Sequence, residues 1–178
     1  MKVLYQMTDK DLSINSMKKA ILILVIVTIF SGASAIGQNL FFIKESSYLS
    51  TEPMNLKANS EDGRNLDVFI AKNQNLNLFV ITQESPAGGM FEGVLIIYLE
   101  DGSVITLKDD NNFSDYVDEK ATSAYKLSDS DMNKLMESNI HTVRFSISGN
   151  RGWAFDDGDW SVSNNGIPTK TIISEFYK

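Results

Sequence analysis

The sequence predicts a single α+β domain, built mainly of antiparallel β-structure as a sheet or a sandwich of hairpins, with one or two short helices. Three Asp-Gly dipeptides lie at residues 62–63, 101–102 and 157–158, and this dipeptide favours tight hairpin turns. Residues 141–148 alternate between apolar and polar side chains, as a half-buried strand does. One short segment between these strands carries the signals of a capped helix.

The dipeptide at residues 101–102 predicts the clearest hairpin, because it joins the apolar runs 94–99 and 104–107. A two-residue loop pairs Leu99 with Val104 and leaves apolar side chains on both faces of the hairpin. We therefore expect this hairpin to be central in its sheet and covered on both sides.

The dipeptide at residues 62–63 predicts a second, weaker hairpin that pairs Leu56 with Phe69. The next strand is expected at Leu78–Thr82. Residues 111–119 are acidic and polar, with few apolar side chains among them, so we expect a long surface loop there.

Two short helices follow from local signals. Ser128 is typical of a helix N-cap, and Asp131 three residues later completes a capping box with the shorter aspartate in place of the usual glutamate or glutamine. Asn139 fits a left-handed end to this helix. Pro168 is typical of a helix start, and the apolar residues within 169–177 fall at helical spacing, although a terminal strand is the alternative.

The lone histidine, His141, falls on the apolar side of the strand 141–148. A Ser-His-acid triad would need it as the base, and a zinc site would have only this one imidazole. No motif of the common hydrolases or nucleotide enzymes accompanies it. We therefore expect a structural role for His141, and the chain is not predicted to be an enzyme.

The third Asp-Gly dipeptide predicts a hairpin in which Asp156 faces Asp159. Two facing carboxylates repel each other, and a hard cation would offset that repulsion. With Asp157 in the turn, these three residues form a candidate Ca²⁺ site, the one cofactor that the sequence suggests. The alternative is an acidic hairpin tip in solvent.

The same hairpin places Trp153, Phe155 and Trp160 on one face, beside Val162. If exposed, the three aromatic rings form a shelf for stacking sugars or contacting a partner protein, and they are the candidate ligand-binding residues. The alternative is that this face belongs to the core.

Residues 1–35 are predicted to be an N-terminal extension and a cleavable signal peptide. Lysines at 18 and 19 precede the apolar run Ala20–Phe30, and the small residues of Ser31–Ala35 fit a signal peptidase, so cleavage is expected before Ile36. A membrane-spanning helix needs about 20 apolar residues, and this run has eleven. The product is expected in the periplasm or outside the cell.

The remainder, residues 36–178, has the length of one domain and contains no cysteine. Disulfides, thiolate metal sites and thiol nucleophiles are therefore excluded. The leader holds four of the sixteen Lys and Arg and two of the twenty-three Asp and Glu, so the remainder carries a net charge of −9. Such a surface repels phosphate backbones and anionic lipid, which argues against nucleic acid and membranes as partners.

Negative charge is concentrated at residues 100–119, where seven acids accompany the single base Lys108. This stretch is either a solvated face or a docking surface for a basic partner.

The segments Leu95–Leu107 and Tyr125–Leu135, followed by Ile140–Phe145, resemble small exported bacterial proteins of unknown function. The resemblance implies secretion and a β-rich domain with a short helix, and it implies no activity.

These observations favour an exported, non-catalytic module that binds a protein, a glycan or a cation at the cell envelope. Two alternatives remain. One is a small secreted hydrolase that uses paired carboxylates, and the other is an inhibitor-type protein with an acidic docking face. A concave pocket with two converging acids would favour the hydrolase.

Overall fold

The computed structural model describes residues 39–178, except residues 75, 86–87, 110–112, 118 and 150–157. In chain order its elements are β1 (Asn39–Ile43), β2 (Ser46–Ser50), β3 (Met54–Ala58), β4 (Leu66–Lys72), β5 (Asn77–Glu84), β6 (Met90–Leu99), β7 (Val104–Lys108), β8 (Ser114–Val117), β9 (Lys120–Leu127), α2 (Asp129–Glu137), β10 (Ile140–Ser148), β11 (Gly158–Ser163) and α3 (Thr169–Phe176). All paired strands are antiparallel. The predicted mainly antiparallel α+β class is therefore confirmed.

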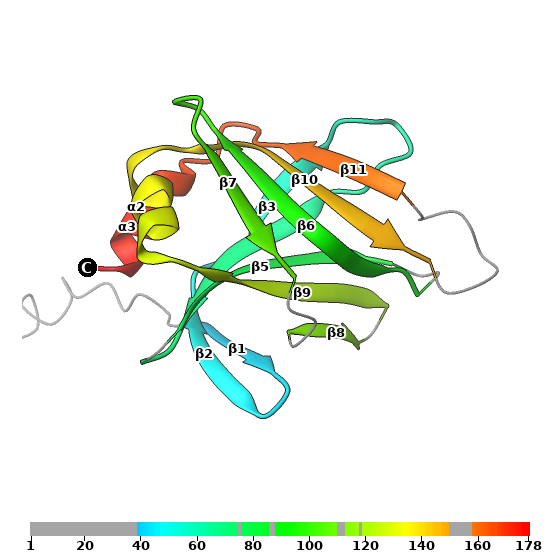
Figure 1. The fold of residues 1–178 in the computed structure, drawn as a ribbon, viewed down its shortest axis with the longest axis horizontal. Helices are drawn as coiled ribbons and strands as arrows, with labels where there is room; N and C mark the ends of the chain where they lie inside the picture. Colours follow the sequence, from blue (N-terminus) through cyan, green and yellow to red (C-terminus); the bar gives the residue numbers. More distant parts are fainter. Residues whose placement is uncertain (1–38, 75, 86–87, 110–112, 118, 150–157) are drawn as a thin grey trace, which may run out of the picture. The chain divides into compact units, whose positions relative to one another are not determined.

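The strands form one sheet in the order β7-β6-β10-β11-β3-β4-β5-β9-β8, and the β1–β2 hairpin is attached to β4 through β2. Figure 1 shows the sheet curled, so that β6 and β7 lie across β5 and β9, while α2 and α3 sit together at one end. Both ends of the strand order can therefore contribute to a single core.

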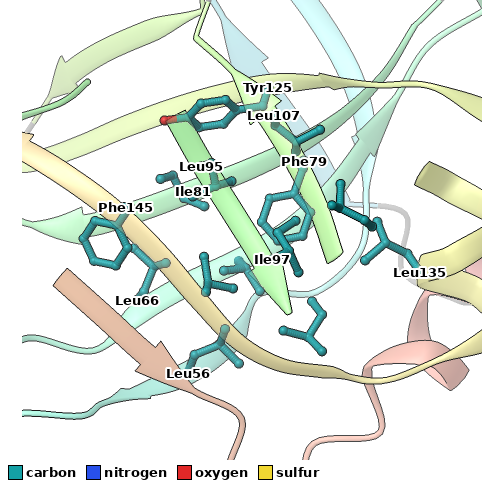
Figure 2. Packing of buried hydrophobic residues seen from close by; sticks show 14 of the residues in the cluster. Leu56, Leu66, Phe79, Ile81, Leu95, Ile97, Leu107, Tyr125, Leu135 and Phe145 are labelled. Carbon is teal, nitrogen blue, oxygen red and sulfur yellow. The ribbon is translucent and has the colours of Figure 1, made fainter. Parts of the chain in front are cut away.

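The main core lies between the facing parts of this curled sheet. Figure 2 shows its side chains converging from strands on both sides of the curl and from α2: Leu56, Leu66, Phe79, Ile81, Leu95, Ile97, Leu107, Tyr125, Leu135 and Phe145. Each of these side chains is at most 4 % exposed. Since the chain has no disulfide, burial of this apolar surface supplies most of the driving force for folding.

A second, smaller cluster covers part of the opposite face of the sheet. There Phe69, Val80 and Ala124 lie in register on β4, β5 and β9, and Ile43 and Tyr48 of the β1–β2 hairpin pack on them. The hairpin thus shields one half of the outer face of these strands.

The first predicted hairpin is present as β6 and β7, but its register differs by one residue. Tyr98, not Leu99, pairs with Val104. The loop has three residues and ends in Gly102 at φ 84°, the three-residue hairpin in which a left-handed residue forms a bulge. Asn139 O accepts from Glu100 N at 2.9 Å, a contact that holds the longer loop.

The shifted register separates a buried face from an open one. Leu95 and Ile97 are fully buried, whereas Val94 and Val104 are 42 % and 41 % exposed. The expected central position was also wrong, because β7 is the terminal strand in the order of the sheet.

The second predicted hairpin is present as β3 and β4, again in a different register, because Leu56 pairs with Leu66 and not with Phe69. The predicted strand at Leu78–Thr82 is confirmed within β5. The loop expected at residues 111–119 was wrong in part, since β8 pairs there with β9.

Helix α2 begins where the sequence predicts it. Ser128 Oγ accepts from Asp131 N at 3.2 Å, and Asp131 Oδ2 accepts from Ser128 N at 3.3 Å, which completes the capping box. The predicted left-handed end at Asn139 was wrong, because Ser138 is the C-cap in an extended conformation. Asn139 instead donates from Nδ2 to Glu100 Oε2 at 2.9 Å.

Strand β10 confirms the predicted alternation from Val143 onward, but His141 was placed on the wrong side. The pairing of β10 with β6 is irregular between Ile140 and Thr142. This bulge turns Ile140 into the core and His141 outward, where its side chain is exposed.

Helix α3 follows Pro168 as predicted, and Asn164 fixes the segment before it. Asn164 Nδ2 donates to Ile140 O and Ile167 O, each at 2.9 Å, and Oδ1 accepts from Ile167 N at 2.8 Å. These bonds join the end of β11 to the start of β10.

We expect Asn164→Ala to lower the free energy of unfolding by about 2–3 kcal/mol, because it removes three hydrogen bonds to backbone groups, and of the two Ile167 groups only the carbonyl oxygen keeps another donor, Thr169 N. The neighbouring exposed Asn165 supplies the control, Asn165→Ala, which should change it by less than about 0.5 kcal/mol. Urea unfolding followed by tryptophan fluorescence measures both, and equal effects would contradict the role of Asn164.

Candidate functional site

A row of polar side chains crosses the outer face of the sheet, beyond the half that the β1–β2 hairpin shields. Its members pair in register from strand to strand: Asn55, Asp67, Thr82, Thr122 and Asp115. Because side chains alternate along a strand, Asp67 shares its face with Phe69, two residues away. The outer face is therefore apolar under the hairpin and polar beside it.

Short hydrogen bonds join neighbours within this polar row. Asn55 Nδ2 donates to Asp67 Oδ1 at 2.7 Å, and Thr122 Oγ1 donates to Thr82 Oγ1 at 3.0 Å. Lys57 Nζ donates to Asn55 Oδ1 at 3.0 Å. These contacts hold the side chains of the row in defined orientations.

The polar row borders a pocket of about 420 Å³. Its lining comes from β3, β4, β5, β9 and the loop before β4: Asn55, Gly63, Arg64, Asn65, Asp67, Thr82, Gln83, Glu84 and Lys120. None of these described lining residues has an apolar side chain. We call this hollow the polar pocket.

Two side chains hold the loop that forms the rim of the polar pocket. Arg64 Nη1 donates to Glu84 O at 2.8 Å, and Gln83 Nε2 donates to Arg64 O at 2.8 Å. Gln83 is buried and Arg64 is exposed. These two bonds tie the β3–β4 loop to the end of β5.

The polar pocket combines two acids, Asp67 and Glu84, with two bases, Arg64 and Lys120. Carboxylates only accept hydrogen bonds, guanidinium and ammonium groups only donate them, and the amides of Asn and Gln do both. The pocket can therefore bind a group that both donates and accepts, such as a sugar hydroxyl.

The predicted aromatic shelf lies mostly outside the described residues, because Trp153 and Phe155 fall within residues 150–157. Trp160 is half-buried and packs against the main core, and it pairs with Phe145 of β10. The shelf stays a prediction.

The predicted Ca²⁺ site also stays a prediction, because Asp156 and Asp157 lie outside the described residues. Asp159 pairs with Ser146 of β10, whose Oγ donates to Asp159 Oδ1 at 2.6 Å. Within the described part of the chain, no group of three His, Cys, Asp or Glu residues is arranged to hold a metal ion.

Several carboxylates of the predicted acidic surface at residues 100–119 accept hydrogen bonds from nearby residues. Asp101 Oδ1 accepts from Ser103 N at 2.9 Å, and this bond is the main cause that lowers the pKa of Asp101 below its usual range. Glu100 accepts from Asn139, and Asp115 accepts from Tyr116 N at 2.8 Å. These acids contribute to turns and strand ends, and a basic partner remains a prediction.

None of the residues that line the polar pocket was predicted as a site. The one signal in the sequence is a polar side chain within an apolar strand, as at Asp67 between Leu66 and Val68. Such a residue shows that a strand has a polar outer face. It does not show which strands lie side by side.

Within the described residues, no helix is long and apolar enough to cross a membrane. Comparisons of the chain with protein-family models, with curated proteins and with solved structures found no match.

Proposed function

We propose that this chain is an exported, non-catalytic module that binds a glycan at the cell envelope, with sugar hydroxyl groups held in the polar pocket. The export part of the proposal rests on the signal-peptide pattern of residues 1–35. Mass spectrometry of the N-terminal peptide of the protein isolated from the producing cells tests export. Retention of Ala20–Phe30 would contradict it.

The observation that carries the binding proposal is the concave, wholly polar lining described above. A sugar hydroxyl donates one hydrogen bond and accepts others, and the amides of Asn55 and Asn65 together with the carboxylate of Asp67 match both needs. The bonds within the polar row hold these groups in place before a ligand arrives, which reduces the entropic cost of binding.

We expect neutral oligosaccharides of envelope type to shift the backbone amide signals of residues 63–67, 82–84 and 120 in nuclear magnetic resonance titrations. Asp67→Asn should weaken the binding about tenfold or more, because it removes a charge-assisted hydrogen bond. Isothermal calorimetry with the same oligosaccharides gives the ratio of dissociation constants.

Asp62→Asn is the matched control, because it removes the same charge from an exposed position in the adjacent β3–β4 loop but outside the lining of the pocket. It should leave the affinity unchanged. Equal weakening by both variants would mean that net charge, not the polar pocket, governs binding, and a panel of oligosaccharides without any shift would refute the proposal.

A hydrolase is the second candidate, because two carboxylates, Asp67 and Glu84, line the same pocket. Paired carboxylates are the minimum requirement of a glycosidase. A general acid is usually kept protonated by apolar surroundings, and this lining has none, so we favour binding. Cleavage of a bound oligosaccharide that is lost in Asp67→Asn and in Glu84→Gln would reverse this preference.

A further inference from the structure

Strand β1 presents an open edge with exposed apolar side chains. Among the described residues it pairs only with β2, and Figure 1 shows the two strands as a hairpin that projects from the rest of the sheet. Leu40 and Phe42 are 59 % and 66 % exposed. An edge of this kind is a template on which another strand can pair.

The two terminal strands of the main sheet differ from β1 in how they are protected. β8 has four residues and contains Asp115, and β7 ends in Lys108. Short length and charged side chains discourage the pairing of edges. β1 has the sequence Asn-Leu-Phe-Phe-Ile and contains no charge, so it is the edge in the described part of the chain without such protection.

Leu40 also borders two hollows whose linings combine apolar and polar side chains. One has a volume of about 340 Å³ and includes Phe41 and Phe69 in its lining. The other has a volume of about 310 Å³ and includes Tyr48 and Leu49. An apolar side chain arriving beside Leu40 would be partly removed from water.

We propose that β1 pairs antiparallel with β1 of a second copy of this chain, about a twofold axis at Phe41. In this register Leu40 of each copy lies opposite Phe42 of the other, and both residues lie on the same face because they are two positions apart. The contact is self-complementary, as an isologous interface requires. It joins the two most exposed large apolar side chains of the described residues.

A second copy fits this edge better than a charged partner does. The uncharged strand offers nothing to select a basic or an acidic protein, whereas its own copy brings an equally uncharged, apolar strand. The net charge of −9 that the sequence predicts without its leader opposes association at long range. Five paired residues also bury less than the standard interface of about 1,600 Å², so we expect a weak dimer, with a dissociation constant of roughly 0.1–1 mM.

Sedimentation equilibrium of the chain as isolated, from about 10 µM to about 1 mM, tests the proposal. The average mass should rise toward that of a dimer with concentration and should stay monomeric in Phe42→Lys. Val104→Lys, an equally drastic change at an exposed site on another edge strand, should dimerise like the wild type. A chain that is monomeric throughout, or a dimer that survives Phe42→Lys, would overturn the proposal.

A charge-pair experiment tests the register itself. Leu40→Lys and Phe42→Glu should each prevent association alone, but a mixture of the two variants places the introduced ammonium group of one copy opposite the introduced carboxylate of the other. We expect the affinity in the mixture to be at least about tenfold higher than that of either variant alone. No recovery in the mixture would refute the register centred on Phe41.

Discussion

Phe79→Ala should lower the free energy of unfolding by about 3–5 kcal/mol, the largest effect we expect from a single substitution in this chain. Phe79 is fully buried on β5, in the same core cluster as Ile97 of β6 and Leu107 of β7, which Figure 2 labels beside it. Truncation loses the burial of the ring and leaves a cavity between two parts of the sheet that are distant along the chain.

Urea unfolding measured against Phe42→Ala gives the matched comparison, because that variant removes the same ring from a site that is 66 % exposed. At low protein concentration Phe42→Ala should change the free energy of unfolding by less than about 0.5 kcal/mol. Similar losses in the two variants would mean that the core does not close around Phe79.

Raising the pH from 10 to 12 should destabilise the fold through Tyr125. Burial raises the pKa of this tyrosine from 10.0 to about 12, with the nearby Asp109 carboxylate adding to the rise and a hydrogen bond with Ser123 opposing it. The unfolded chain therefore loses this proton near pH 10, whereas the folded chain keeps it until about pH 12. Stability is complete below pH 10 and falls as pH rises toward 12, by up to roughly 3 kcal/mol.

Tyr125→Phe isolates this contribution, because it has no phenol to titrate. The free energy of unfolding, measured by urea denaturation at several pH values between about 9 and 12, should fall less steeply in the variant than in the wild type. Burial also raises the pKa of Tyr177 to about 12, so some slope should remain in Tyr125→Phe. Parallel curves for the two proteins would contradict the assignment to Tyr125.

The elements that the sequence predicts best are those whose signals are local. Helix α2 is an example, because its capping box joins Ser128 to Asp131, only three residues apart in the sequence. The first two predicted hairpins were also found, but not their registers, and the third lies partly outside the described residues. The β6–β7 loop gains a third residue because Asp101 N donates to Ser138 Oγ at 3.1 Å and Glu100 N donates to Asn139 O, and neither contact is visible from the turn alone.

The polar pocket could not be predicted in the same way, because it depends on which strands become neighbours. Asn55, Asp67 and Thr82 belong to three strands that pair in register, and a shift of one residue would turn a side chain to the opposite face. The turn of His141 out of the core has a similar origin, since it depends on a bulge against β6.

The position of β11 in the sheet has a consequence for the order in which the protein can be assembled during synthesis. This strand is the seam between β10 and β3, and Asn59 Nδ2 reaches across it to Ser161 Oγ at 3.0 Å, over a separation of 102 residues. A nascent chain cannot close that seam until β11, residues 158–163, has left the ribosome. Until β11 is available, β10 and β3 lack the strand that joins them, and a chain in that state would still be open enough to pass through a narrow translocation channel.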